Sequence, residues 1–357
     1  MLSGAGLSNV HVYEREQRSS ESQSGGVIGL GHVALGIFER LGIDQREFAR
    51  FPSEWEITIK LVDRRETRRA RSRFPGRNVR WGDLHRVLAA CLPAGVLHEG
   101  ERVTGIGTNG VDRAVLHRAG QPDVPADLIV FADGRRSIGR ELLDPGRPVR
   151  YAGFVAHRGR LMRWPDGVRD FQHYVSPGTQ FDTFPIELSD GRVGIEWALY
   201  QNMTAVGFRE RFGADPTRRT FVPAAGVTDR VRAELDAVAD ELLPAQLAEW
   251  VRETAQRMAV PILDIDPLSF MTTNIGSTRA VLLGDALATP RPQTFAGANH
   301  GIAQAAGLAN ALGQHLKYGA HLATALTGVQ RRHLREVHET LHSGIETCVR
   351  NGLGTSH

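Results

Sequence analysis

The sequence predicts an α/β fold with an inserted antiparallel sheet and C-terminal helices. Two apolar segments, 127–132 and 280–284, have the pattern of buried strands that end in an acidic turn, as strands of a parallel sheet often do. Between them lie short runs of aromatic and β-branched residues, which are typical of antiparallel strands. These runs cover 151–161, 171–175, 181–184 and 192–199. Helical periodicity returns at 299–317 and 321–349.

The other elements alternate along the chain as the α/β pattern requires. Apolar periodicity and turn residues predict strands at 9–14, 55–62, 96–98, 102–106 and 113–117, a polar loop at 15–26, and helices at 32–41, 81–92 and 227–258. We find no internal repeat and no long linker, so the domains are expected to be closely joined.

Composition excludes several classes of protein. The 357 residues are 41% hydrophobic and 23% charged, which is ordinary for a globular protein of about two domains. No apolar run reaches the ~18 residues of a membrane span, and no secretory signal is readable, so we expect a cytoplasmic protein without a membrane partner. Cys91 and Cys348 are far apart and have no metal-ligand spacing, so neither a disulfide nor a metal site is expected.

The positive charge does not indicate a nucleic-acid partner. Net charge is only +3, although the pI is about 9.1. The densest basic cluster comprises Arg64, Arg65, Arg68, Arg69, Arg71 and Arg73. Acidic residues flank the cluster and no aromatic residues interleave with it, so we interpret it as a solvated, arginine-rich strand edge.

Two segments carry chemistry. In the first, the strand that begins at Asp127 ends in Asp133-Gly134, which places a carboxylate and a permissive backbone at a sheet edge where α/β folds bind ligands. In the second, the strand from Ala280 ends at Gly284, and Asp285 and a proline-bearing loop follow, before a helix near Asn299. Asp285 could accept a bond from a ribityl or ribose hydroxyl, and the helix offers free N–H groups. Taken alone, either aspartate could simply cap its own turn.

Taken together, the two segments resemble the downstream FAD fingerprints of the flavoprotein aromatic-ring monooxygenases, the family typified by p-hydroxybenzoate hydroxylase. Val12 to Arg15 is similar to that family's second strand, whose terminal acid holds the adenosine ribose. Tyr151 to Gly159 and Phe184-Pro185 are similar to the start of its substrate sheet, most of all in the branch of 2,6-dihydroxypyridine hydroxylase. The resemblance covers residues 5 to 345 and depends on the combination of these motifs.

The resemblance implies a fold and an activity. The fold is a Rossmann-like FAD-binding domain with an inserted antiparallel-sheet substrate domain. The implied domains are 1–150 (FAD-binding, with a sheet excursion near 50–75), 151–265 (substrate), 266–320 (FAD-binding) and 321–357 (C-terminal helix). In the family, NADH or NADPH reduces FAD, O2 forms a C4a-hydroperoxyflavin, and this hydroxylates an aromatic or heteroaromatic small molecule. A homodimer is a candidate assembly.

It also implies roles for particular residues. Glu14, with Arg15 beside it, would contact the adenosine ribose, while Asp133 and Gly134 would support the pyrophosphate. Asp285 would meet the ribityl chain. The loop beside the isoalloxazine would contain Pro292, Gly297, Ala298 and Asn299. Trp81 occupies the position where many members place an FAD-binding arginine, and Gln304 replaces an acid usual in the last FAD helix.

The substrate sheet offers candidates for proton transfer and for an aromatic pocket. His157 and His173 could deprotonate a phenolic substrate, because histidine titrates near neutral pH. Tyr174, Phe184 and Trp197 could line the pocket. We expect His157 and these three aromatic residues to face the same cavity as Pro292 and Gly297. The simpler alternatives are histidines on an exposed strand face, which also applies to His300, and aromatic residues of an ordinary core.

The sequence departs from the family at its beginning. The family starts with a strand and a G-x-G-x-x-G turn, whereas only Leu2 to Gly6 precede the acidic strand here. We expect either that the native reading frame begins upstream or that another segment fills this place. Two alternatives stay open: a degenerate member without tight FAD binding, acting as a non-redox enzyme or an accessory subunit, and a nicotinamide enzyme that uses Gly29 and Gly31. The second fits G-x-G-x-x-A, but no acid ends a strand about 20 residues later.

Overall fold

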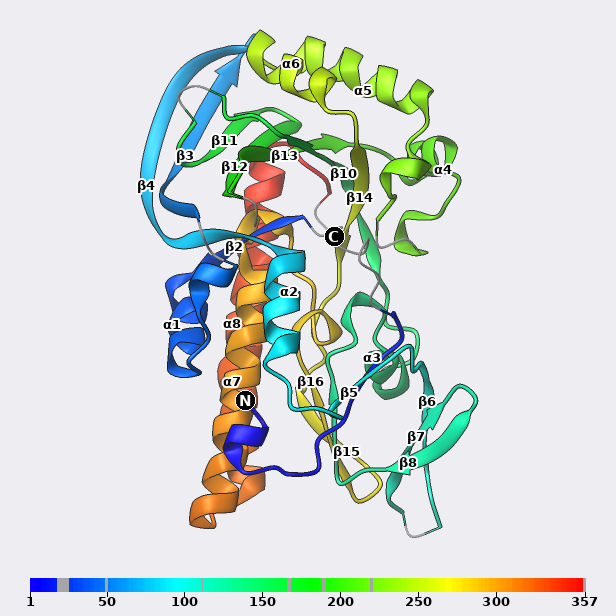
Figure 1. The fold of residues 1–357 in the computed structure, drawn as a ribbon. Coiled ribbons are helices and arrows are strands. Elements are labelled where there is room, and N and C mark those ends of the chain that lie inside the picture. The colour runs from blue at the N-terminus through cyan, green and yellow to red at the C-terminus, as the bar shows by residue number, and fades with distance from the viewer. Residues whose placement is uncertain are drawn as a thin grey trace.

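An eight-stranded sheet separates two layers of the molecule (Figure 1). The computed structural model describes residues 1–17, 26–48, 51–110, 112–165, 168–187, 191–218 and 221–355. The sheet order is β14 (Arg257–Asp264), β10 (Arg150–Leu161), β13 (Val193–Asn202), β12 (Thr179–Glu187), β11 (Phe171–Ser176), β3 (Phe51–Val62), β4 (Arg65–Arg80) and β2 (Val27–Gly31). Neighbours are antiparallel except β11 and β3, which pair in parallel. The predicted antiparallel texture of 151–199 is therefore confirmed, and strands from 27–80 widen the sheet.

Helices cover the upper face of the sheet. Side chains from β12 and β13 form a core with α5 (Asp229–Leu242) and α6 (Ala245–Glu253), which cross the top in Figure 1. The sequence predicts one helix over 227–258, but the chain makes two. Leu243 is extended because Pro244 follows it, so α5 ends there. The chain then enters β14, whose Pro261 removes one backbone donor and obscures the strand pattern.

The α/β layer lies below the sheet. Helix α7 (Ala296–Tyr318) runs beside α8 (Leu322–Arg350), as Figure 1 shows, and ends at Gly319, which adopts a left-handed φ of 66°. The remaining helices are α1 (His32–Arg40), α2 (Trp81–Ala90), α3 (Ile138–Leu143) and α4 (Ala205–Phe212). The predicted helices at 32–41, 81–92, 299–317 and 321–349 are confirmed within a few residues. No described helix is both long and apolar enough to cross a membrane.

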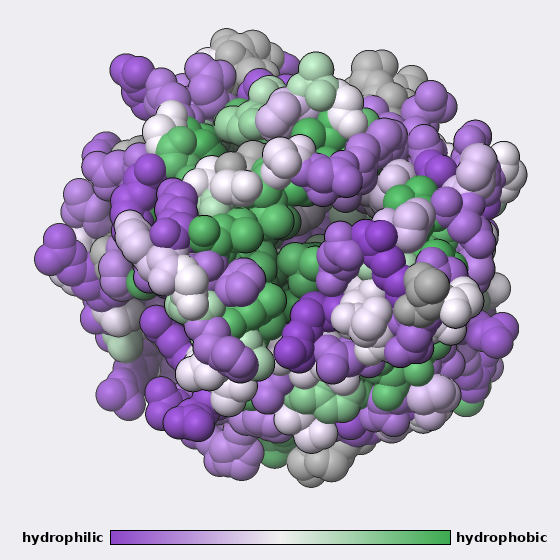
Figure 2. All heavy atoms as spheres, turned by 90° about the horizontal axis from the view of Figure 1, so that it is seen from below, coloured by the Kyte–Doolittle hydropathy of each residue, from purple (hydrophilic) through white to green (hydrophobic). Residues whose placement is uncertain are grey.

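Short sheets complete the α/β layer. In one, β1 (Val12–Glu14) pairs in parallel with β5 (Leu97–Glu99). In a second, β9 (Leu128–Phe131) pairs in parallel with β16 (Thr278–Leu282), which also pairs with β15 (Thr272–Ile275). The third contains β6 (Val103–Thr108), β7 (Ala114–Arg118) and β8 (Gln121–Pro125). Among the described residues, β1 and β9 thus each have one strand neighbour. Seen from below, the molecule has a hollow that apolar side chains surround (Figure 2).

The arginine-rich hairpin behaves as a solvated strand edge, as predicted. Side chains from Arg65 to Arg73 in β4 are exposed. Arg69 pairs with Glu66, and the guanidinium carbon of Arg71 lies 3.5 Å from the centre of the Trp55 ring. These local partners offset part of the positive charge, which agrees with a solvated surface.

A buried ion pair joins the two layers. Arg291, just before α7, donates two bonds to Asp264 at the end of β14, at 2.9 and 2.7 Å. Both side chains are only 1% exposed. Arg291 also donates to the carbonyl of Thr355, so the C-terminal segment is held at the same point.

We predict that Arg291→Met destabilises the protein by about 3–5 kcal/mol, because the buried carboxylate of Asp264 would lose the guanidinium that balances its charge. Urea denaturation measures this change. The double variant Arg291→Met/Asp264→Leu should recover most of the loss. As a control, Arg150→Met removes the more exposed pair with Asp266 and should cost no more than about 1 kcal/mol. A loss for Arg291→Met as small as that of the control would contradict the prediction.

Candidate active site

The turn after β16 places Asp285 in a polar junction. The 3-10 turn Gly284–Ala286 packs against the turn Gly134–Arg136, which follows β9. Buried Arg140 fixes this junction by donating to the carbonyls of Asp285 and Ala286. The carboxylate of Asp285 lies 3.4 Å from Arg135 and is one-third exposed. In the described structure Asp285 does not cap its own turn, which removes the simpler interpretation of this residue.

Asp285 faces the start of α7. A Cβ added to Gly297 would lie 4.0 Å from its carboxylate, so the first turn of the helix and the aspartate are neighbours. The Cα of Gly301 lies 3.8 Å from where a Cβ of Gly284 would be, which shows how closely helix and turn approach. Gln304 accepts a bond from the Gly284 amide at 2.7 Å and so orients the turn. The N-cap residue Phe295 has no capping side chain, and Thr294 accepts from the Ala296 amide alone, so among the described residues the next N–H groups of the first turn are open to a ligand oxygen.

The other predicted cofactor-binding residues are either bonded to nearby residues or exposed. Asp133 accepts from the Ile138 amide at 2.7 Å and thus supports the start of α3, while Gly134 has a φ of 77°. Glu14 is exposed at the end of β1 and accepts from the Glu16 amide. Arg15 pairs with Glu16. Trp81, the first residue of α2, is 47% exposed.

Asn299 has a structural task. Its amide donates to the carbonyl of Gly29 and accepts from the amide of Gly31, which ties α7 to β2. Ala298 packs beside the cluster of α1 and α2.

The glycine motif of β2 lies in an antiparallel edge strand paired with β4. A dinucleotide turn needs a parallel strand inside a βαβ unit, so the structure excludes the nicotinamide interpretation of Gly29 and Gly31.

An aromatic face of the large sheet meets the start of α7. Phe171 and Phe184 have ring centroids 4.6 Å apart. Phe295, the residue before α7, lies edge-on to Phe171 at 4.8 Å. Of the four residues expected to face one cavity, Phe184 is the one that lies on this face.

The other three point to the opposite side of the sheet. Trp197 stacks on Phe181 and donates to Thr254 in the core with α5 and α6. Tyr174 packs against the same core. His157 is 3% exposed beside Phe212 of α4, and burial, aided by Arg211 and Arg257, lowers its pKa to about 4. The expectation of one shared cavity is wrong for these three, because alternate residues of a strand face opposite sides.

His173 lies on the aromatic face but has no free nitrogen. Nδ1 bonds Asp182 and Nε2 bonds Glu56, both at 2.8 Å. Burial alone would lower the pKa of His173, but the two carboxylates outweigh it and raise the pKa to about 9. With both nitrogens bonded to carboxylates and its pKa raised, His173 favours the cationic form, which disfavours the predicted role of His173 as a base. It instead bridges a buried carboxylate and a partly exposed one.

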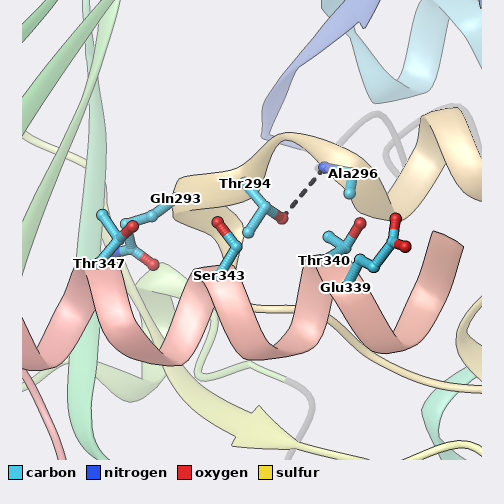
Figure 3. Close-up of a pocket in the computed structure, with 7 residues that line it drawn as sticks. All are labelled: Gln293, Thr294, Ala296, Glu339, Thr340, Ser343 and Thr347. Carbon is cyan, nitrogen blue, oxygen red and sulfur yellow. Dashed lines mark hydrogen bonds between the residues drawn. The ribbon is translucent and has the colours of Figure 1, made fainter. Parts of the chain in front are cut away.

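A polar cavity lies behind the Pro292–Thr294 turn (Figure 3). Its volume is about 330 Å³, and it is lined by Gln293, Thr294, Ala296, Glu339, Thr340, Ser343 and Thr347. Thr294 accepts a bond from the Ala296 amide there. The cavity is on the α8 side of the turn and has no aromatic lining. His300 contacts Thr340 near it, and burial lowers the pKa of His300.

Sequence reasoning missed several residues of the aromatic face. Phe171 and His173 alternate with Tyr174 in β11, and Asp182 alternates with Phe181 in β12. Both faces therefore carry aromatic residues, so the pattern along one strand does not tell which face is which. Phe295 and Glu56 carry no local signal, because only the tertiary fold brings them to β11.

We predict that the free energy of unfolding falls as pH rises from 6.5 to about 9. His173 has a raised pKa in the folded state, so its stabilisation is complete below its ordinary value of 6.5 and is lost as pH passes 9. Denaturation of wild type and His173→Gln across this range measures the effect, and the variant should lack this component. His157→Gln is the control, since His157 titrates near pH 4. Equal slopes for wild type and His173→Gln would refute the assignment.

Comparisons with known proteins find relatives in sequence and in fold. No protein-family model matches the chain. It is 26% identical over 330 residues to a 6-hydroxynicotinate 3-monooxygenase of Bordetella bronchiseptica, covering 86% of this chain and 76% of the relative. The structure of 2,6-dihydroxypyridine-3-hydroxylase from Arthrobacter nicotinovorans superposes with a TM-score of 0.84 at 19% identity, covering 100% of this chain and 89% of that one.

A solved structure with bound cofactor also has this fold. The Klebsiella pneumoniae protein HpxO, in complex with FAD and uric acid, superposes with a TM-score of 0.77 at 18% identity. The alignment covers 98% of this chain and 84% of that chain. The chain is thus similar in sequence to a 6-hydroxynicotinate 3-monooxygenase and has the fold of solved aromatic hydroxylases, one of which was solved with FAD.

Proposed function

We propose that this protein is a flavin-dependent monooxygenase that hydroxylates a small aromatic or heteroaromatic ring. The observation that carries the proposal is the meeting of two layers at the start of α7. Asp285 lies beside Gly297 on one side, and the rings of Phe171 and Phe184 contact Phe295 on the other. Polar groups for a flavin and a buried aromatic cluster are thus adjacent.

The residues at this junction suit FAD. The carboxylate of Asp285 can accept bonds from ribityl hydroxyls, and the first-turn N–H groups of α7 can donate to oxygens of the flavin ring. FAD, reduced by NADH or NADPH, supplies the activation of O2. The pyrophosphate turn of the family has no counterpart among the described residues, so these contacts account for the flavin and ribityl portions.

The chain's own contribution is to orient the substrate and to hold charge. Phe171 and Phe184 would pack on an aromatic ring and exclude water from it. The His173 imidazole lies 4.0 Å from Phe171, ring centre to ring centre, and the carboxylates of Asp182 and Glu56 fix its orientation. Asp182, His173 and Glu56 form a hydrogen-bonded row from the buried face toward solvent.

The substrate class follows from the apolar face and the relatives. A single hydroxylated ring, such as a hydroxypyridine, is electron-rich enough for hydroxylation and is comparable in size to the phenyl rings of this aromatic face. We also propose O2 as co-substrate. The assignments of Glu14, Asp133 and Trp81 as cofactor-binding residues remain part of this proposal.

We predict that Asp285→Ala weakens FAD affinity by about 1.5–3 kcal/mol, the value of a hydrogen bond to a charged group. Titration of FAD fluorescence measures affinity. Thermal unfolding without FAD should barely change, because Asp285 is one-third exposed and its contact with Arg135 is long. The matched control is Asp266→Ala, another partly exposed aspartate paired with an arginine. Unaltered FAD affinity together with a large loss of stability would show that Asp285 is structural.

A further inference from the structure

The residue that joins the two layers, Phe295, has a backbone conformation that is unusual for its type. Its φ is 54° and its ψ is 13°, in the left-handed region between the Pro292–Thr294 turn and α7. Bulky residues rarely adopt this conformation, which glycine or asparagine would occupy without strain. Placement of the ring must therefore offset a backbone cost.

The ring lies in a socket built from three strands. It contacts Phe171 of β11 edge-on at 4.8 Å, and His173 and Phe74 at 5.8 and 5.9 Å between ring centres. Gly29 of β2 also lies against the ring. A Cβ at this position would be 3.1 Å from a Phe295 ring carbon and 3.2 Å from a Phe74 ring carbon.

The socket explains a motif that the cofactor site does not use. Gly29 belongs to the Gly-Leu-Gly sequence of β2. Its φ is not positive, so the backbone conformation does not require glycine at this position. It makes room for two aromatic rings that approach from α7 and β4. Asn299 fixes the same contact from the helix by donating to the carbonyls of both Gly29 and Phe295.

We propose that Phe295 is a specificity-determining residue, whose ring closes one side of the substrate space and limits it to single-ring ligands. This inference rests on the proposed function, which places the substrate against Phe171 and Phe184. The Phe295 ring occupies the space between the start of α7 and Phe171. A second fused ring of a ligand would have to enter this space.

Phe295→Ala and Phe295→Gly test the proposal together. Both variants remove the ring, but only glycine also removes the backbone strain. A change in the ratio of the two ligand affinities that both variants share is therefore caused by loss of the ring. The probes are 6-hydroxynicotinate, with one ring, and 4-hydroxyquinoline, with two fused rings. Binding is measured by quenching of tryptophan fluorescence and by ligand-dependent thermal shift, neither of which needs turnover.

Wild type should prefer the single-ring probe, and both variants should shift the ratio of the two affinities at least about tenfold toward the fused probe, as expected when a pocket wall is removed. Phe295→Leu, which keeps a bulky wall, should retain the wild-type ratio and serves as the control if the smaller variants lose stability. Ratios within about twofold of wild type in folded Ala and Gly variants would overturn the proposal.

Flavin content separates this proposal from the proposed function. Each variant is incubated with FAD, and the bound flavin is measured by its absorbance at about 450 nm. If wild type and variants bind flavin but the ratio of the two ligand affinities is the same in all of them, the specificity proposal is wrong and the proposed function stands. No bound flavin in wild type, with the ratios changed as expected, defeats the proposed function and leaves Phe295 as the wall of an aromatic site.

Discussion

The active-site geometry depends on the buried ion pair between Arg291 and Asp264. A doubly bonded arginine and aspartate, both 1% exposed, connect the segment before α7 to the last strand of the large sheet. Separating the layers would leave two charges in an apolar environment, which is far more costly than losing an exposed pair. The turn from Pro292 to Phe295 follows directly from this anchor, so the distance between α7 and the aromatic face is fixed by it.

The two faces of the large sheet differ in composition. The upper face, with Trp197 and Phe181, is an ordinary core under α5 and α6. The lower face combines Phe171 and Phe184 with a charged row of Asp182, His173 and Glu56. Charge so close to aromatic rings is costly to bury unless each group is paired, and here each carboxylate bonds the same imidazole. A structural core alone does not require such a row.

The sequence predicted the fold class because long-range motifs and periodicity agreed with each other. Asp285 followed an apolar strand and preceded a helix, and the structure brings it to the start of α7. The assignment of residues to faces failed for His157, Tyr174 and Trp197, since an antiparallel strand that is buried on both faces shows no polar alternation. Phe295 could not be found, because its contacts with Phe171 and Gly29 span more than a hundred residues.

The most direct measurement of the central claim is the source of the oxygen in the product. The protein with FAD, NADH or NADPH is incubated under isotopically labelled O2 with a panel of hydroxylated pyridines and benzoates, and the products are examined by mass spectrometry. The account predicts that one labelled oxygen atom enters the ring of at least one single-ring compound. Consumption of reductant with label only in hydrogen peroxide, and none in any ring, would contradict it.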